Sequence, residues 1–406
     1  MRARRTRAMR AIYGAGRQGQ FCLEGLRKHG LDADFFIDSY TPNTEVSGLK
    51  VYRIKDVPNP DSVQVFVAIS DNVTYGQSID GVLRSAGFRE IYDIDYILRN
   101  YEAVFLNFSE KPVVWYKGSA DGRVDTSGIK ALRSLLKDPK SQMLLNRIIR
   151  FRSNFHHMNY VESDNEVEYF PSDVPFHNEN IPLIFADCGA FRGETVAAAL
   201  ENWKGPKQAV CCFEANRFER ENLEACLTEH ASKTPETHFY LCPMATWSSN
   251  TTLTFDGSMG MGSSVVPGAE GAEGGASAAE PTASPTQIRV PAMPLDAVFQ
   301  DTPPTMIKMD IEGAEIEALK GASSIISETA PILAICLYHE PEHLWEIPIL
   351  IHSMQKNYDM YLRVHSLMCM STVLYCVPKR DGRAPTPWKG RPSPDSLRVT
   401  GGIRVV

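Results

Sequence analysis

The sequence lacks an apolar stretch long enough to cross a membrane. No run approaches the roughly 20 apolar residues that a transmembrane helix needs. The first residues, Met1-Arg-Ala-Arg-Arg-Thr-Arg7, also lack the apolar core of a secretion signal. We therefore expect a cytoplasmic protein without a membrane span, in which residues 1–10 are a disordered basic leader.

The chain also lacks an excess of positive charge and any paired cysteine motif. Its formal net charge is −7, whereas binding to nucleic acid usually requires a basic surface. The nine cysteines are an odd number, and none forms a pair at the spacing of a zinc ribbon. These absences argue against nucleic acid as a partner and favour buried, reduced thiols.

Two stretches lack residues that could form a core. Residues 267–285 consist mainly of Gly, Ala, Ser, Glu and Pro without an aromatic residue, which predicts a mobile insertion, either a lid or a tolerated surface loop. Residues 381–406 are polar and rich in proline, which predicts a disordered tail. The rest of the 406 residues is too long for one ordinary core and suits two domains.

The most informative motif lies in residues 184–195, Ile-Phe-Ala-Asp-Cys-Gly-Ala-Phe-Arg-Gly-Glu-Thr. An apolar run followed by Asp-x-Gly-x-x-x-Gly predicts a strand, a tight turn and the start of a helix. Gly189 and Gly193 would let the backbone approach a ligand, and the helix start would direct N–H groups at it. The next apolar run ends in Glu214, near the distance at which a doubly wound fold binds ribose hydroxyls. The alternative to a ligand-binding turn is an ordinary turn that only connects a strand to a helix.

A third apolar run, residues 306–309, ends in a group of carboxylates. Asp310 follows the run directly, and Glu312 comes two residues later, before a helical pattern that Gly321 ends. Parallel strands open onto a crevice at their carboxyl ends, so we expect these carboxylates to lie at the same edge as Glu214.

These segments give the chain a resemblance to a known family. They are Asp187-Cys-Gly-Ala-Phe-Arg-Gly-Glu-Thr195, Phe213-Glu-Ala-Asn216, residues 307–322 with Asp-Ile-Glu-Gly-Ala-Glu, and Pro331-Ile-Leu-Ala-Ile335. Over roughly residues 169–378 the chain is similar to the FkbM-type S-adenosylmethionine-dependent methyltransferases. The resemblance implies a class I methyltransferase fold with an antiparallel last strand at residues 372–377. It further implies S-adenosylmethionine as cofactor, with Glu214 on the ribose hydroxyls, and these binding positions: Asp187, Gly189, Ala190, Gly193, Thr195, Glu214, Asn216 and Asp310.

A hydroxyl acceptor needs a base to take its proton as it attacks the methyl group. His339, which follows the apolar run 331–337, is the predicted general base because an imidazole titrates near neutral pH, and Asp310 would orient it or bind the acceptor. A hydrogen-bonded loop histidine is the alternative for His339, and helix capping is the alternative for Asp310 and Glu312. Spacing also leaves open a divalent metal bound by Asp310, Glu312 and His339.

Residues 11–100 predict a Rossmann-like nucleotide-binding domain of their own. Gly14, Gly16 and Gly19 form G-x-G-x-x-G after a strand, and Asp38 ends the next strand, where an acid would meet a ribose. The segment 39–52 resembles the nucleotide-sugar-binding N-terminal domains of bacterial sugar acyltransferases. A sugar nucleotide, a dinucleotide and a scaffold without a ligand all remain open for this domain.

The sequence thus predicts an α/β protein with two doubly wound Rossmann-like domains. A helical connector and entrance segment at residues 101–180, with a break near Asp138-Pro139, would join the first domain to a methyltransferase domain at residues 181–380. We expect an S-adenosylmethionine-dependent O-methyltransferase acting on a hydroxyl of a sugar, glycan precursor or similar small molecule, including nucleotide-linked acceptors. The alternatives are a nicotinamide-dependent nucleotide-sugar-modifying enzyme and a nucleotide-sugar-binding scaffold with a degenerate methyltransferase domain.

Overall fold

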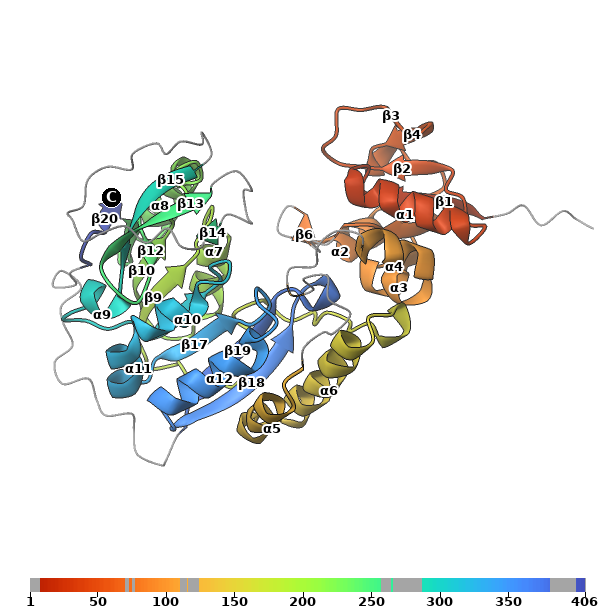
Figure 1. The fold of residues 1–406 in the computed structure, drawn as a ribbon. Coiled ribbons are helices and arrows are strands. Elements are labelled where there is room, and N and C mark those ends of the chain that lie inside the picture. Colours follow the sequence, from red (N-terminus) through yellow and green to blue (C-terminus); the bar gives the residue numbers. More distant parts are fainter. Residues whose placement is uncertain are drawn as a thin grey trace, which may run out of the picture. The chain divides into compact units, whose positions relative to one another are not determined.

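The chain folds into two compact units, shown in Figure 1. The computed structural model describes residues 8–69, 73–74, 77–109, 115, 124–256, 264–265, 287–379 and 399–405. Unit 1 is assigned Met1–Gly122, Asn146–Asp164 and Ser366–Met370, and unit 2 the three segments Arg123–Leu145, Asn165–His365 and Ser371–Val406. Residues 1–7 of the predicted leader 1–10 and the predicted insertion 267–285 lie outside the described residues. The end of the leader is corrected, because Met9 and Arg10 pair with a neighbouring strand. Within the described residues, every helix is too short or too polar to span a bilayer.

Unit 1 is built on a six-stranded sheet in the order β3-β4-β2-β1-β5-β8. Each neighbouring pair is parallel except β3 and β4, which are antiparallel. The strand bounds are β1 Met9–Tyr13, β2 Phe35–Ile37, β3 Glu45–Val46, β4 Leu49–Tyr52, β5 Val63–Val67 and β8 Glu90–Tyr92. Because α1 (Arg17–Lys28) connects β1 to its parallel neighbour β2, the predicted βαβ unit is confirmed.

The helices of unit 1 extend past the predicted domain boundary at residue 100. They are α1, α2 (Ile79–Ser85), α3 (Ile94–Asn100) and α4 (Glu102–Ser109), with the short turns η1 (Ile54–Asp56), η2 (Pro60–Ser62), η3 (His157–Asn159) and η5 (Leu367–Cys369) and the small β6 (Val73–Thr74) and β7 (Gln77–Ser78) pair. Helix α4 packs on α1 so closely that a Cβ on Gly25 would lie 2.6 Å from the Cα of Val104. The beginning of the predicted connector therefore belongs to the core of unit 1.

Unit 2 contains an eight-stranded sheet in the order β18-β19-β17-β16-β9-β10-β11-β20. Its five central strands, from β17 to β11, are parallel. β19 runs antiparallel to both neighbours, which confirms the antiparallel strand predicted at residues 372–377. The bounds are β9 Leu183–Cys188, β10 Lys207–Phe213, β11 His238–Cys242, β16 Met306–Met309, β17 Ile332–Cys336, β18 Tyr358–Val364, β19 Thr372–Pro378 and β20 Ile403–Val405.

The end of the chain corrects the prediction of a disordered tail over residues 381–406. Ile403–Val405 forms β20, which pairs antiparallel with β11 and continues the sheet by one strand. An edge strand offers unpaired backbone N–H and C=O groups, so even a polar segment can pair with it. Sequence composition does not report this because the bonds come from the backbone. Residues 380–398 lie outside the described part of the chain.

Helices α5 (Thr126–Leu135), α7 (Glu194–Asn202), α8 (Arg220–Lys233), α9 (Leu295–Val298), α10 (Glu315–Lys320), α11 (Ser323–Thr329) and α12 (His343–Met354) belong to unit 2. Helix α6 (Pro139–Ser153) begins in unit 2 and ends in unit 1, and the gap between α5 and α6 confirms the predicted break near Asp138-Pro139.

A second sheet, in the order β12-β15-β13-β14, was not predicted; its strands are β12 Ala245–Thr246, β13 Thr251–Asp256, β14 Ser264–Val265 and β15 Gln287–Met293.

A buried arginine holds the α5–α6 turn onto unit 2. Arg363 on β18 is fully buried, and its guanidinium lies 2.8 Å from Asp138 and 3.0 Å from Asp173. Ser141 accepts a further hydrogen bond from it at 3.0 Å. The middle of the predicted connector is therefore fixed inside unit 2, and residues 101–180 divide between the two units instead of forming a separate body.

Replacing Arg363 by Met should leave Asp138 without its cation and Asp173 with Lys140 as its remaining partner. We expect the free energy of unfolding of unit 2 to fall by about 2–4 kcal/mol, near the range for breaking a buried ion pair. Urea unfolding followed by circular dichroism measures this. In Arg84→Met, which breaks the exposed pair with Asp80, the change should stay within about 0.5 kcal/mol. Equal effects in the two variants would contradict the anchoring role of Arg363.

Candidate active site

The predicted glycine turn follows β9 and leads into α7. Gly189 has φ +80°, and a Cβ there would lie 1.9 Å from the backbone oxygen of Asp310. Gly193, with φ +90°, precedes α7, and a Cβ there would lie 2.7 Å from the Sγ of Cys226. Both positions therefore require glycine for the backbone itself. The amides of Gly189 and Ala190 both donate to the Phe213 carbonyl, which fixes the turn to the end of β10.

A buried ion pair lies directly beneath this turn. The Nζ of Lys308 is 3.0 Å from Asp187 Oδ1 and donates to the Gly189 carbonyl at 2.7 Å. The hydroxyl of Thr195 donates to Asp187 Oδ2 at 2.7 Å. Burial alone would lower the pKa of Lys308, but the charges of Asp187 and Asp310 outweigh it and raise that pKa. The side chains of Asp187 and Thr195 thus shape the turn, and their predicted cofactor contacts stay a prediction.

Glu214 stands at the end of β10, beside the same turn. Its carboxylate accepts the Phe191 amide at 2.8 Å and the Asn216 amide at 2.6 Å. Burial raises the pKa of Glu214 to about 7, and the two amides, Lys308 and Arg220 only partly oppose this shift. Two amides leave further lone pairs of the carboxylate for other donors. The site therefore holds a carboxylate that more hydrogen-bond donors would stabilise in its charged form.

Asp310 begins a cluster of polar side chains at the carboxyl ends of β16 and β17. The hydroxyl of Tyr169 donates to its Oδ2 and that of Tyr338 to its Oδ1, each at 2.9 Å. His339 Nε2 lies 3.3 Å from Oδ1. Burial would raise the pKa of Asp310, but the bond from His339 and the charge of Lys308 hold it well below its usual range. The lowered pKa favours the ionised form of Asp310, and its predicted role in orienting His339 or binding the acceptor stays a prediction.

His339 is enclosed by three carboxylates and is only 2% exposed. Its Nδ1 lies 2.8 Å from Glu315, and its Nε2 faces both Asp310 and Glu312, the latter at 3.5 Å. Burial would lower the pKa of His339, but the charges of Glu315 and Asp310 raise it well above its usual range. A raised pKa favours the charged imidazolium over the neutral ring expected of a general base, and the catalytic role of His339 stays a prediction. Residue type alone had suggested a neutral base.

Glu312 has the features of a strained and titratable residue. Its φ of +55° lies in the left-handed region, which non-glycine residues rarely adopt and which often marks functional sites. Burial raises the pKa of Glu312 to about 7, with Asp310 adding to the shift and His339 opposing it. Helix capping does not explain Glu312, because the cap of α10 is Ala314 and no side chain bonds there. The metal site left open for Asp310, Glu312 and His339 stays a prediction.

The structure adds residues that the sequence analysis did not select. Lys308 interrupts the apolar strand Met306–Met309, a signal that could have identified it. Tyr169 and Tyr338 reach Asp310 from segments far apart in the sequence, so no local pattern indicates them. Glu168 also lies beside Asp310, and burial together with that charge raises its pKa to about 7. Glu315, fully buried, bonds the Ile311 amide at 2.9 Å and pairs with His339.

In unit 1 the predicted glycine motif forms a tight turn between β1 and α1. Gly14 has φ +97°, and a Cβ on Gly19 would lie 1.8 Å from the Gly14 carbonyl oxygen. Around Gly16, by contrast, nothing lies within 4 Å of an added Cβ. Asp38 accepts amide bonds at 2.8 Å from Ala15, Tyr40 and Thr41. Its carboxylate therefore closes the turn onto the end of β2, and its predicted ribose contact stays a prediction.

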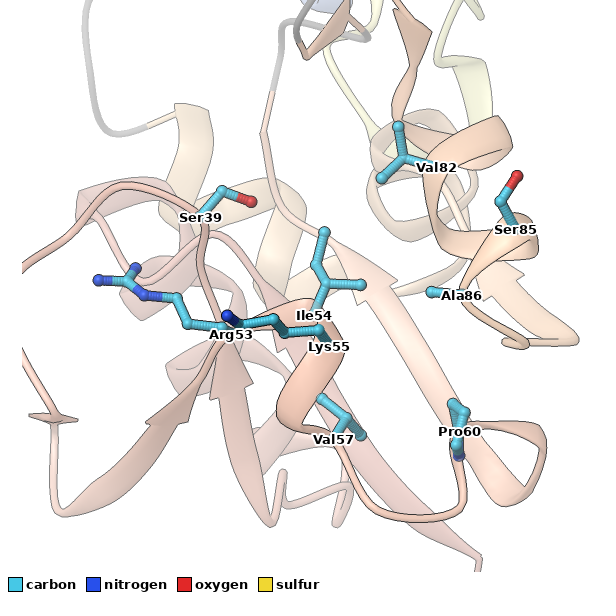
Figure 2. Close-up of a pocket in the computed structure, with 9 residues that line it drawn as sticks. All are labelled: Ser39, Arg53, Ile54, Lys55, Val57, Pro60, Val82, Ser85 and Ala86. Atoms are coloured by element: carbon cyan, nitrogen blue, oxygen red, sulfur yellow. The ribbon is translucent and has the colours of Figure 1, made fainter.

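A cavity of about 820 Å³ lies next to this turn (Figure 2). Ser39, Arg53, Lys55 and Ser85 supply its polar lining, and Val82 supplies part of the apolar wall. The Arg53 guanidinium is held by the carbonyls of Asp38 and Thr41 at 2.8 and 2.6 Å. Gly14, Gly16, Gly19 and Asp38 do not line this cavity. The structure thus separates the predicted nucleotide-binding residues from the cavity beside them.

Residues 187–367 match the model of the methyltransferase FkbM domain, so the chain carries an FkbM domain and is a methyltransferase enzyme. No curated protein sequence matches the chain. Its structure is similar to the crystal structure of methyltransferase FkbM from Methylobacillus flagellatus KT, with a TM-score of 0.53 and 21% identity over 92% of this chain and 91% of that one. At this identity the likeness shows the fold.

Replacing Lys308 by Met should lower the free energy of unfolding more than the loss of a surface lysine does, because it leaves the buried Asp187 without its cation. We expect a loss of about 3–5 kcal/mol in the free energy of unfolding. Urea unfolding of the full chain measures it. Adding Asp187→Asn to this variant should recover part of the loss, because the uncompensated charge is then gone.

The matched control is Lys320→Met, which removes an exposed lysine paired with Glu317. That change should cost no more than about 1 kcal/mol, as for other surface ion pairs. If Lys308→Met is as stable as Lys320→Met, the pair does not hold the turn.

Proposed function

We propose that this methyltransferase transfers a methyl group from S-adenosylmethionine to a hydroxyl oxygen of a sugar, a glycan precursor or a similar small molecule. The observation that carries the proposal is that the glycine turn, Glu214 and the Asp310 cluster follow the ends of β9, β10, β16 and β17. These four strands are parallel neighbours, so their carboxyl ends share one edge of the sheet. Ligands of open α/β sheets bind at such an edge.

The residues present fit the proposed cofactor. Glu214 is buried, keeps lone pairs beyond its two amide bonds and has a raised pKa, which suits a carboxylate that receives two ribose hydroxyls. Gly189 lacks a Cβ at the point where the turn passes the end of β16, and α7 begins just after this turn. When bound, S-adenosylmethionine supplies the electrophilic methyl group. Asp187 and Lys308 keep the turn in the shape that would hold it.

The acceptor hydroxyl must lose its proton, and we assign that proton to Glu312. A general base works best when its pKa lies near the operating pH, and Glu312 has a pKa of about 7. His339 is held as a cation by its carboxylates, so its role becomes the stabilisation of the ionised Glu312 and Asp310. Asp310, with its two tyrosine donors, orients this cluster.

The acceptor class follows from this chemistry. A carboxylate base beside tyrosine hydroxyls suits a neutral, hydroxyl-bearing molecule, and unit 1 would select a nucleotide-linked acceptor if its turn over Gly14, Gly16 and Gly19 holds the nucleotide. Calorimetry of the full chain with S-adenosylhomocysteine and a panel of free sugars and nucleotide sugars tests both parts. Including NADH separates this proposal from the nicotinamide-dependent alternative. No heat from S-adenosylhomocysteine would contradict the proposed cofactor.

Glu214→Gln should weaken the binding of S-adenosylhomocysteine by about tenfold or more, because charge-assisted bonds to two hydroxyls contribute about 1.5–3 kcal/mol each. The wild-type affinity should also depend on pH. Ribose hydroxyls stabilise the charged carboxylate, so binding lowers the pKa of Glu214 from about 7. Affinity should therefore be highest above pH 7 and fall as the pH decreases below it.

Calorimetry across this pH range makes the measurement, and the exposed Glu221 provides the control, as Glu221→Gln. That variant should keep both the wild-type affinity and its pH dependence, whereas Glu214→Gln should show a flat profile. An unchanged affinity in Glu214→Gln would remove Glu214 from the cofactor site.

His339 and Glu312 can be distinguished by their titrations. In NMR spectra of the protein with labelled histidine, the His339 ring should remain protonated between about pH 6 and 8, where an ordinary histidine loses its proton. With an acceptor identified by the panel, kcat should fall below about pH 7 as Glu312 takes up a proton. Glu312→Gln should lower kcat by about 10² or more and abolish this fall, because general-base catalysis typically contributes 10² to 10⁴.

The sequence-based hypothesis of a neutral His339 base predicts the opposite pattern. The fall in kcat at low pH would then persist in Glu312→Gln and disappear in His339→Gln. Loss of activity on EDTA treatment, restored by Mg²⁺ or Mn²⁺, would instead assign Asp310, Glu312 and His339 to a metal.

A further inference from the structure

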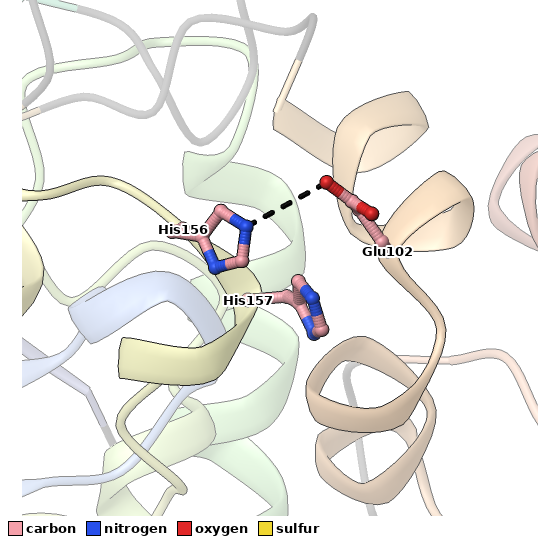
Figure 3. A group of neighbouring side chains, drawn as sticks. All are labelled: Glu102, His156 and His157. Carbon is pink, nitrogen blue, oxygen red and sulfur yellow. Dashed lines mark ion pairs between the residues drawn. The ribbon is translucent and has the colours of Figure 1, made fainter.

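A second group of potential ligands lies in unit 1, apart from the carboxylate cluster of the FkbM domain. Glu102 is the first residue of α4, and His156 and His157 lie at the start of η3. Each side chain offers a ligand atom within 4.8 Å of those of the other two. In Figure 3 the two imidazoles and the carboxylate gather at one place, with an ion pair between Glu102 and His156. Neither the FkbM domain nor the proposed methyl transfer uses these residues.

The two histidine rings are close but not equivalent. Their centroids are 4.5 Å apart, with planes inclined by 41°. His157 Nδ1 lies 2.8 Å from the Arg99 carbonyl oxygen, which can only accept a hydrogen bond. Nδ1 therefore carries the proton of the neutral ring, and Nε2 keeps a lone pair. This is the arrangement found in metal-binding histidines, where a backbone carbonyl fixes the tautomer and the ring orientation.

His156 and Glu102 supply the other two donors. His156 Nε2 lies 3.6 Å from Glu102 Oε1, and its Nδ1 accepts the Met158 amide over a long 3.2 Å. Without a metal, Nε2 therefore carries the proton that faces Glu102. A cation bound at Nε2 would take the place of this proton. The ring proton would then move to Nδ1, and the long hydrogen bond from the Met158 amide would be lost. Glu102 would then neutralise the cation in place of the proton.

The segments that carry these ligands are fixed in place by other contacts. Asp95 on α3 accepts the hydroxyl of Tyr160 at 2.5 Å and the amide of Ser163 at 2.9 Å, just beyond η3. Arg99, whose carbonyl orients His157, forms an ion pair with Glu162. A site built on fixed elements loses little freedom when it binds an ion. Because α3 contacts both α4 and η3, the two segments that carry the ligands are held through the same helix.

We propose that Glu102, His156 and His157 form a binding site for Zn²⁺ within unit 1. Two imidazole nitrogens and one carboxylate oxygen are typical zinc ligands, and three protein ligands leave the fourth tetrahedral position to water. Ca²⁺ and Mg²⁺ prefer oxygen ligands and do not suit two imidazoles. Half-exposed side chains, with Glu102 at 54% and His156 at 44%, give the ion direct access from solvent. The bound ion joins α4 to η3 and stabilises unit 1.

Isothermal titration of ZnCl₂ into the untagged, chelator-treated full chain tests the proposal. We expect one zinc site that His157→Ala abolishes and that Glu102→Gln weakens by about tenfold or more, since even second-shell partners contribute 10- to 100-fold. Excess Zn²⁺ should raise the melting temperature of the wild type and leave that of His157→Ala unchanged, because only a form that binds the ion is stabilised. Co²⁺ in place of Zn²⁺ should give a tetrahedral absorption spectrum without a thiolate band.

His352→Ala is the matched control, because it removes a histidine of unit 2 that lies on α12. It should bind zinc as the wild type does. Circular dichroism of the variants establishes that each is folded, and Glu102→Gln keeps the shape of the side chain if His157→Ala fails to fold. The proposal is overturned if the wild type takes up no zinc, or if zinc binds both Glu102→Gln and His157→Ala as tightly as it binds the wild type. A thiolate band in the Co²⁺ spectrum would overturn it as well.

Discussion

A buried ammonium group connects the two motifs on which the site depends. Lys308 lies on β16, in register with Asp187 on the neighbouring β9, and its Nζ reaches both the Asp187 carboxylate and the Gly189 carbonyl. A lysine is almost never fully buried unless it is paired. Its charge also lowers the pKa of Asp310 at the end of its own strand. One side chain thus fixes the glycine turn and favours the ionised form of Asp310.

Several parts of the fold were predictable because they depend on local patterns. The βαβ unit of residues 11–38 and the break between α5 and α6 follow from apolar periodicity, glycine and proline, and both are confirmed. The antiparallel strand at residues 372–377, which the family resemblance implied, is confirmed as well. The strand β20 and the four-stranded sheet were missed because they depend on backbone pairing between distant segments. The boundary at residue 100 was missed for a related reason, since only the packing of α4 on α1 reveals it.

The candidate site likewise has a part that local motifs predicted and a part that depends on contacts between distant residues. Sequence motifs selected Glu214, Asp310, Glu312 and His339, and the last three meet as expected for parallel strand ends. What the motifs could not provide is the electrostatic environment. Glu315 accepts a hydrogen bond from the Ile311 amide and contacts His339, and its charge raises the pKa of the imidazole. The identity of a residue thus indicated a base, whereas its neighbours indicate a cation.

The carboxyl groups around the site fall into two classes, and the difference is chemical. Asp310 and Glu315 contact His339 directly and have lowered pKa values, so they are fixed anions. Glu168, Glu214 and Glu312 are also largely buried but are less well compensated, and each has a pKa of about 7. The first class holds the imidazolium in place and cannot take up a proton at neutral pH. Only the second class can exchange protons there, and Glu312 is its member in contact with His339, which supports the proposal that Glu312 takes the proton of an acceptor hydroxyl.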